Sequence, residues 1–370
     1  MFSRPVKSLI STWFQRGSFP RREPTLKKIC CVKLEVSEPG VIAEKALNLG
    51  ISLVRTWLEC KTQTPRKVKI RLIRSLFSAA RIPLYVWASL VSQILIVVTG
   101  GVVRLTGSGL GCPTWPKCTA ESLVNTPEMG VHGIIEFANR LLTFVLALVA
   151  VLTFVTIVRL GKKVRKGLFA PALILGLGIP AQAVLGGFTV LFNLNPWFVG
   201  AHFVLSAYMI AVASVLVWRA IKSEHTPVTP AIWSMVNPIA VSGIITILVG
   251  VLVTGAGPHS GDAESPRNGL DLEVWQHFHS YPGYVMLGLI VLQLTLIVRR
   301  DAKWLGSFQA KVVFGLLVTS IFQAIIGVVQ ARLGVPPLLV GIHMLGAASL
   351  CSLLTFQWLV IRGKQSVKAE

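Results

Sequence analysis

The chain has 370 residues, of which 53% are hydrophobic and 14% are charged, and its formal net charge at pH 7 is +21. Soluble domains carry about a quarter charged residues, and disordered chains are poor in apolar residues, so the composition excludes both classes. What remains is a protein that crosses a membrane several times. Residues 1–82 hold 17 of the 36 Lys and Arg residues, and loops hold most of the others, so the charge does not require a nucleic-acid partner.

Residues 1–82 form a basic N-terminal arm without a membrane-length apolar run or a cleavable signal pattern. Five basic residues lie just before the first apolar run and suit the anionic lipid of an inner leaflet: Arg66, Lys67, Lys69, Arg71 and Arg74. We expect the arm to be cytoplasmic and poorly ordered. A mitochondrial presequence is the less favoured alternative, because the arm also contains five acidic residues.

Eight apolar runs follow the arm, each about 20 residues long, which is the length that crosses the hydrocarbon core. Such runs must be helical, because lipid offers no partner for open backbone groups. They are residues 83–105, 132–158, 168–190, 197–219, 231–254, 273–298, 308–331 and 337–361. The sequence thus predicts an all-α polytopic membrane protein with eight transmembrane helices.

The loops between these runs alternate in charge. Residues 159–166 hold five basic residues, whereas residues 106–131 contain Lys117 as their single basic residue. Cytoplasmic loops are enriched in Lys and Arg, so this alternation puts both termini in the cytoplasm. We expect the cell membrane of a bacterium, in contact with its lipid, in preference to the mitochondrial inner membrane.

The apolar runs repeat. Gln182-Ala183-Val184-Leu185-Gly186 matches Gln323-Ala324-Ile325-Ile326-Gly327 at an offset of 141 residues, and Val199-Gly200-Ala201-His202 matches Val340-Gly341-Ile342-His343 at the same offset. An internal repeat of this kind indicates a repeated structural unit. We therefore predict two pseudo-symmetric four-helix bundles, residues 83–222 and residues 223–370, the second with a short tail.

Histidines occur inside the predicted membrane helices, where an ionisable residue is costly and marks a candidate functional site. His202 and His343 occupy equivalent positions in the repeat, which predicts two equivalent sites. In the second bundle, His279 is placed to face His343 from a neighbouring helix. Two histidines across a four-helix bundle suit the axial ligation of haem iron. His277 is the alternative ligand if the register differs.

In the first bundle, the position that matches His279 is Asn139, a poor ligand for haem iron. His132, Glu136 and Asn139 share one helix face at 100° per residue, and Arg140 follows directly. A polar stripe of this kind in a membrane helix predicts a cavity or a polar ligand. The alternative interpretation is an interfacial first turn with ordinary caps.

Six cysteines are present, and Cys112 and Cys118 lie together in the loop after the first membrane helix. The predicted topology exposes this loop to an oxidising compartment, so we expect a short disulfide loop. Metal binding is the minor alternative, because no nearby acid or histidine completes a site.

The segment Val103-Arg104-Leu105-Thr106-Gly107-Ser108-Gly109-Leu110-Gly111-Cys112-Pro113, followed by Trp115-Pro116 and Cys118, resembles the haem A synthase family. The resemblance covers residues 83–361 and not the arm. It implies an enzyme that oxidises a ring methyl group of haem O to the formyl group of haem A, for the terminal oxidase. It also implies partners: haem O as substrate, a haem O synthase and a redox partner.

The resemblance implies a role for each candidate residue. His279 and His343 would hold a haem b, His202 would bind the substrate haem, and Glu136 would be catalytic. Arg104 and Arg140 are candidates for pairing with haem propionates, because a guanidinium fork suits a carboxylate. The family has a histidine where this chain has Asn139, so His132 and Asn139 are both candidates for the substrate pocket.

Two other classes of protein are alternatives to this one. A di-haem b-type protein that oxidises quinol and transfers electrons would hold two permanent haems and modify neither. A transporter with parallel repeats would have a site at the middle of the membrane and broken helices, whereas these histidines lie near helix ends.

Overall fold

The computed structural model describes residues 75–221, 228–300 and 306–362, and the described part consists of helices joined by loops, with no strand in it. The short helices are η3 (Ala79–Arg81), η4 (Pro127–Met129) and α7 (Pro230–Ser234). The long helices are α3 (Ile82–Leu105), α4 (Gly130–Arg159), α5 (Lys162–Leu191), α6 (Pro196–Ala220), α8 (Val236–Ala256), α9 (Leu272–Arg300), α10 (Phe308–Arg332) and α11 (Pro337–Arg362). Eight segments are long and apolar enough to cross a membrane, which confirms the predicted fold class. The predicted arm lies almost entirely outside the described residues.

Local sequence sets the ends of several helices. The Asn195 side chain accepts a hydrogen bond from the backbone N–H of Trp197 at 3.0 Å, and Pro196 occupies the first turn, so α6 begins there. Pro238 lacks an N–H that could bond to the carbonyl of Ser234, and the helix is interrupted at Met235, between α7 and α8. One predicted helix, residues 231–254, is therefore two helices in the structure.

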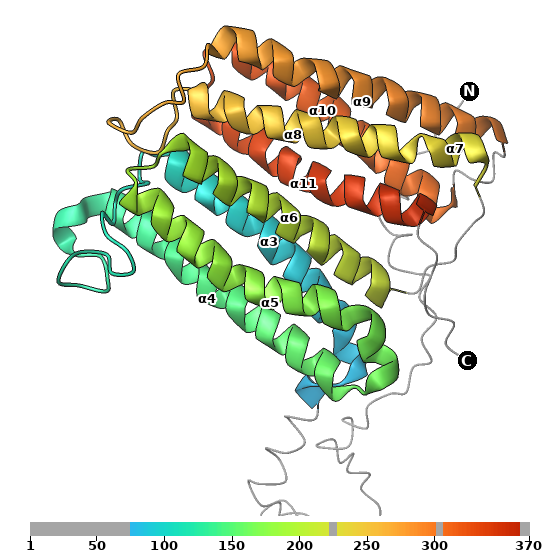
Figure 1. Ribbon diagram of the computed structural model, residues 1–370, viewed down its shortest axis with the longest axis horizontal. Helices are drawn as coiled ribbons and strands as arrows, with labels where there is room; N and C mark the ends of the chain where they lie inside the picture. The colour runs from blue at the N-terminus through green and yellow to red at the C-terminus, as the bar shows by residue number, and fades with distance from the viewer. Residues whose placement is uncertain (1–74, 222–227, 301–305, 363–370) are drawn as a thin grey trace, which may run out of the picture. The chain divides into compact units, whose positions relative to one another are not determined.

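The long helices form two groups of four, which lie side by side in Figure 1. In the first group, α3 and α5 each pack against both α4 and α6; in the second, α8 and α10 each pack against both α9 and α11. The helices α4 and α6 are therefore diagonal partners, as are α9 and α11. The two groups meet where α3 and α6 contact α11 and where α6 also contacts α8.

The interface between the groups contains small residues and a few hydrogen bonds. A Cβ atom on Gly101 of α3 would lie 2.8 Å from the Cε of Met344 on α11, so the two helices approach closely there. The buried hydroxyls of Ser214 and Ser352 are 2.9 Å apart, and the N–H of Gly109 donates to the carbonyl of Gly261 at 2.8 Å. The first two contacts hold the first group directly against α11, which carries His343, and the third joins the loop after α3 to loop 257–271.

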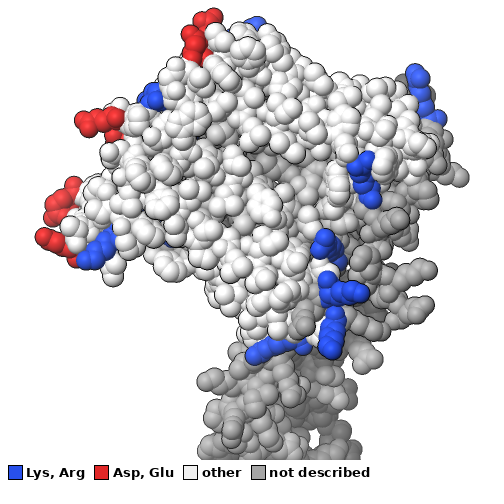
Figure 2. All heavy atoms as spheres, in the orientation of Figure 1, with Lys and Arg blue, Asp and Glu red and all other residues white. Residues whose placement is uncertain are grey.

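The two ends of the helix groups differ in the sign of their charged residues. We call the end that contains loops 106–129, 192–195, 257–271 and 333–336 the acidic end and the opposite end the basic end. Apart from the buried Glu136, the described acidic residues all lie at the acidic end: Glu121, Glu128, Asp262, Glu264, Asp271 and Glu273. Figure 2 shows acidic side chains over one end of the molecule and mostly basic ones over the other.

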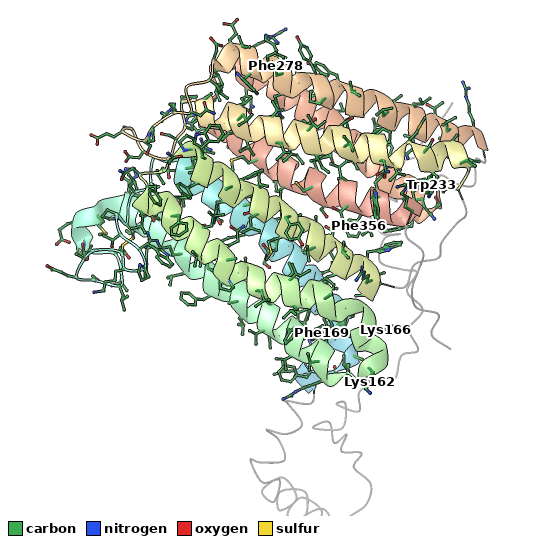
Figure 3. All side chains as sticks on the ribbon, viewed as in Figure 1. Lys162, Lys166, Phe169, Trp233, Phe278 and Phe356 are labelled. Carbon is green, nitrogen blue, oxygen red and sulfur yellow. A yellow bond between two sulfur atoms is a disulfide. The ribbon has the colours of Figure 1, made fainter. Side chains whose placement is uncertain are left out.

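Aromatic and basic side chains gather at the basic end. Figure 3 shows Lys162 and Lys166 there in the first group and Trp233 in the second. The guanidinium of Arg362 lies 3.7 Å from the centre of the Trp233 ring. This cation–π contact ties α7 to the end of α11.

The close-packed apolar cores occupy the half of each group near the basic end. In the first group, the core includes Val86, Ile157, Leu175 and Leu216, and in the second it includes Ile232, Ile290, Leu316 and Leu354. The halves near the acidic end carry glycines and the histidines instead. The fold thus leaves its less tightly filled halves for the candidate sites.

Candidate functional site

His279 on α9 and His343 on α11 face each other across the second group. Their ring centres are 6.2 Å apart, and the ring planes meet at 72°. Two imidazoles on opposite sides of one iron atom, each with a nitrogen about 2 Å from the metal, would have their ring centres about 6 Å apart. The separation therefore fits bis-imidazole ligation of a haem.

The orientation of His279 is set by its neighbours. Its Nδ1 lies 2.9 Å from the carbonyl oxygen of Thr246. A carbonyl can only accept, so Nδ1 carries the proton and Nε2 keeps its lone pair, as a metal ligand must. A Cβ on Gly250 would lie 2.8 Å from the Cε1 of His279, so only glycine leaves room for the ring there.

His343 and His202 are held in similar ways on α11 and α6. A Cβ on Gly327 would lie 3.5 Å from the Cε1 of His343, and one on Gly186 would lie 3.2 Å from the Cε1 of His202. Both Nδ1 atoms are buried and have no hydrogen-bond partner within the described part of the chain. The glycines of the two repeated Gln-x-x-x-Gly segments therefore contact the two repeated histidines.

Gln182 supports His202 through the backbone. Its Nε2 donates to the carbonyl of His202 at 3.2 Å and to the hydroxyl of Ser206 at 2.7 Å. The Ser206 hydroxyl in turn donates to the carbonyl of His202 at 2.9 Å. These bonds fix the turn of α6 that carries the imidazole.

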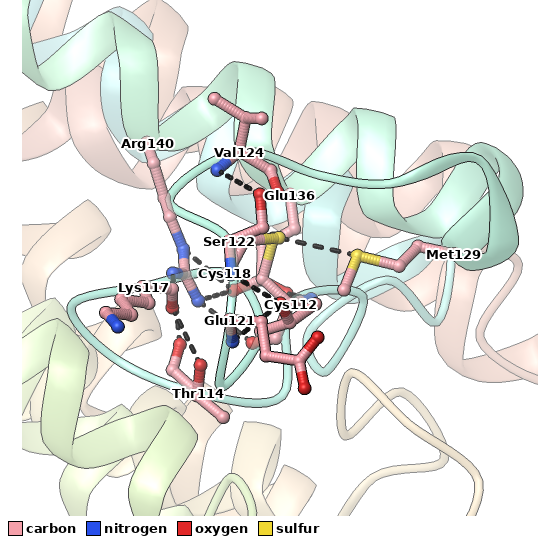
Figure 4. The surroundings of a disulfide bond; sticks show 11 residues. Cys112, Thr114, Lys117, Cys118, Glu121, Ser122, Val124, Met129, Glu136 and Arg140 are labelled. Carbon is pink, nitrogen blue, oxygen red and sulfur yellow. Dashed lines mark hydrogen bonds and ion pairs between the residues drawn. A yellow bond between two sulfur atoms is a disulfide. The ribbon is translucent and has the colours of Figure 1, made fainter.

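Glu136 lies at the centre of a buried polar cluster near the start of α4 (Figure 4). One carboxylate oxygen accepts the backbone N–H of Cys112 at 2.6 Å, and the other accepts the guanidinium of Arg140 at 2.5 Å. Arg140 also donates to the backbone carbonyls of Cys112, Thr114 and Lys117. Glu136 and Arg140 thus hold the loop after α3 against α4.

That loop is closed by a disulfide between Cys112 and Cys118. Its Trp115 reaches α5, where a Cβ on Gly187 would lie 2.5–2.9 Å from the indole ring atoms. The neighbouring Gly186 contacts His202. We name residues 112–118 the cap loop, because they cover the acidic end of the first group from α4 to α5.

His132 and Asn139 occupy different places on α4. The Nδ1 of His132 lies 2.9 Å from the hydroxyl of Ser108, and the residue is exposed. Seven residues, or about 10 Å of helix, separate it from Asn139. The amide oxygen of Asn139 is buried and has no hydrogen-bond partner among the residues that the structure describes.

Arg104 connects the two groups. It donates to the backbone carbonyl of Thr254 at 2.7 Å and to that of His259. The guanidinium groups of Arg104 and Arg140 thus both bind backbone carbonyls. Their pairing with haem propionates stays a prediction.

Sequence reasoning did not identify three elements of the site. Thr246 sets the tautomer of His279, Gly250 makes room for its ring, and Trp115 packs on Gly187. Gly186 and Gly327 lie four residues after Gln182 and Gln323 in the repeat, and this regular spacing was a signal that glycines pack beside the histidines. The carbonyl of Thr246 leaves no trace in the sequence, because any residue supplies one.

The described residues contain no group of three or more His, Cys, Asp or Glu side chains that could hold a metal ion by themselves. A haem needs at most two protein ligands, because the macrocycle supplies the other nitrogens. One or two histidines are therefore sufficient protein ligands for a haem.

Comparison with known proteins shows the family of this chain. Residues 83–355 match the family model of the COX15-CtaA cytochrome oxidase assembly proteins. The chain is 26% identical over 299 residues to a heme A synthase of Alkalihalophilus pseudofirmus, covering 76% of this chain and 97% of that protein. It is 33% identical over 175 residues to one of Bacillus pumilus, covering 44% of this chain and 54%, or about half, of that protein.

A shorter match, 39% identical over 62 residues, is to a protoheme IX farnesyltransferase of Thermus thermophilus and covers 16% of this chain and 10% of that protein. The family model extends over most of the chain and includes the cap loop. His132, His202, His279 and His343 all lie inside it. The chain therefore belongs to the COX15-CtaA family of cytochrome oxidase assembly proteins.

Proposed function

We propose that the protein is a haem A synthase that oxidises a ring methyl group of haem O to a formyl group. The observation that carries the proposal is that His279 and His343 lie at bis-imidazole separation in one group of helices. The other group carries His202 on α6 and the Glu136–Arg140 ion pair on the diagonal helix α4. The names of the relatives support a role in haem A biosynthesis.

His279 and His343 would hold the resident haem b, and the separation of their rings fits that group. When bound, haem b would supply a one-electron acceptor beside the substrate site. Thr246 keeps the proton of His279 on Nδ1, and Gly250 and Gly327 leave room for the two rings. The close packing of α3 on α11, at Gly101 and Met344, would keep the two sites adjacent.

His202 would bind the iron of haem O in the first group, with the cap loop covering the site. Conversion of a methyl to a formyl group with oxygen from water releases four electrons and four protons. Glu136 would position water and accept a proton at its carboxylate, as a general base does. Arg140 neutralises and orients this carboxylate, and the cap loop would shield the site from bulk water.

The charge distribution supports a location in the bacterial cell membrane with both termini in the cytoplasm. The described basic end carries no acidic residue, and cytoplasmic loops are the ones enriched in Lys and Arg. The bacterial relatives favour this membrane over that of a mitochondrion. The haem O would come from a haem O synthase, and a redox partner would take up the electrons.

The test is the haem content of the variant Glu136→Gln, expressed in cells that make haem O but lack their own haem A synthase. Glutamine keeps an acceptor for the N–H of Cys112 but cannot serve as the base. We expect haem A to fall by about 10²-fold or more while the haem b spectrum persists. The exposed Glu128, also at the acidic end, provides the control Glu128→Gln, which should keep normal haem A.

Normal haem A in Glu136→Gln would refute the role of Glu136. Wild-type protein that holds two haems b and never forms haem A would refute the synthase and indicate a di-haem electron-transfer protein. Protein without any haem would refute both.

A further inference from the structure

Asn139 stands in α4 where His279 stands in α9. Both helices begin at the acidic end, and each packs between two neighbours that also contact the diagonal helix. In the second group, His279 reaches across that diagonal to His343. An offset of 140 residues relates Asn139 to His279, and one of 141 relates His202 to His343. The first group thus has an amide where the second has an imidazole.

The histidine on the diagonal helix has similar surroundings in both groups, His202 on α6 and His343 on α11. The imidazoles of His202 and His343 each contact the glycine of the preceding helix, and each has a buried, unpartnered Nδ1 within the described chain. His202 is therefore placed to be an axial ligand in the same way as His343. The two sites differ on the side opposite this histidine, where the first group has Asn139 and the second has His279.

The buried amide oxygen of Asn139 needs a hydrogen-bond donor, and the described part of the chain provides none. An amide oxygen is not among the usual ligands of haem iron, and the Asn side chain is shorter than that of His. His132 does not fill the place, because it lies about 10 Å away along the helix and is bonded to Ser108. A small ligand that carries its own proton, such as water, would satisfy the amide oxygen.

We propose that the first group binds haem iron through His202 alone and leaves the opposite axial position open to a small ligand that hydrogen-bonds to Asn139. The inference rests on the proposed function, because it assumes that the first group binds haem O. The second group is closed on both sides by His279 and His343. Only the haem of the first group is therefore free to bind a small molecule.

Carbon monoxide is the probe. Purified full-length protein, loaded with haem O in detergent and reduced with dithionite, should bind about one CO per chain, and the haem of the second group should stay low-spin. In Asn139→His, an imidazole would occupy the open position, so CO affinity should fall by about 100-fold or more and a second low-spin spectrum should appear. Asn139→Leu should keep CO binding but lose the water, so that its ferric spectrum becomes five-coordinate.

The matched control is Ala138→His, because Ala138 is the exposed neighbour of Asn139 on α4. It adds the same side chain one position away and should leave CO binding unchanged. Wild-type protein with two low-spin haems and no CO binding would overturn the inference but not the proposed function. Unchanged CO affinity in Asn139→His would also overturn it. Failure to take up any haem beyond haem b would overturn the proposed function itself.

Discussion

The imidazole of His279 lies between the carbonyl oxygen of Thr246, 2.9 Å from its Nδ1, and the ring of His343, whose centre is 6.2 Å away. The hydrogen bond leaves Nε2 as the free nitrogen of His279. Each part of this arrangement comes from a different helix, so the two-histidine site exists only in the assembled second group.

The glycines beside the three histidines should differ in their tolerance of alanine. A Cβ would lie 2.8 Å from the His279 ring on Gly250, 3.2 Å from the His202 ring on Gly186 and 3.5 Å from the His343 ring on Gly327. Gly250→Ala should therefore disturb the haem b spectrum most, and Gly327→Ala should leave it near normal. Optical and electron paramagnetic resonance spectra of the purified variants measure this, and a larger change in Gly327→Ala than in Gly250→Ala would contradict it.

Removal of Arg140 should destabilise the cap loop. Arg140→Ala leaves the buried carboxylate of Glu136 without its ion pair, and we expect a loss of about 3 kcal/mol, the low end of the range for a buried pair, because the Arg140 side chain is 22% exposed. Hydrogen exchange of the amides of residues 112–118 and the thermal unfolding midpoint in detergent report this loss. Arg140→Lys keeps the charge but not the guanidinium fork, so its loss should be smaller. Equal protection of the cap loop in Arg140→Ala and the wild type would argue against the clamp.

Alanine at Gly187 should displace Trp115 from α5. The new Cβ would lie 2.5–2.9 Å from the indole ring, and overpacking of this kind costs about 1–3 kcal/mol. Limited proteolysis of the cap loop should become faster. Gly176 lies on the same helix with no described atom within 4 Å of a Cβ position, so Gly176→Ala is the control and should leave proteolysis unchanged. Resistance of Gly187→Ala to proteolysis would show that Trp115 does not hold the loop.

A buried glutamine pair near the basic end should behave as one unit. The Nε2 of Gln357 donates to Gln293 at 3.0 Å, and Gln293 donates to the carbonyl of Ile232 at 3.2 Å. Gln357→Leu should cost about 1–3 kcal/mol, because it leaves a buried acceptor unpaired, whereas replacing both glutamines with leucine should cost less than the sum of the single changes. Thermal unfolding of the two single variants and the double variant gives the coupling, and strict additivity would contradict it.

The helices could be predicted from the sequence within a few residues, because a membrane-length apolar run has few alternatives to a helix. The exception was the break at Met235, which Pro238 explains after the fact. The facing of His279 and His343 was also expected, but from neighbouring helices, whereas α9 and α11 are diagonal in the structure. Glu136 was recognised as part of a polar stripe that Arg140 follows, but the ion pair of these two residues and their hold on the cap loop were not.

The sequence by itself determined that this protein is helical and spans a membrane, and it identified the family, because apolar length, the distribution of charge and a long local motif are all properties of the chain order. Only the tertiary structure decided which partners the site residues contact. His279 lies within hydrogen-bond distance of the Thr246 carbonyl, Glu136 accepts the N–H of Cys112, and Trp115 packs against Gly187. Such contacts join helices that are distant in the chain, and the +21 charge and the low charged fraction carry no information about them. They depend on how the helices pack, and packing is settled by the shapes of all the side chains together.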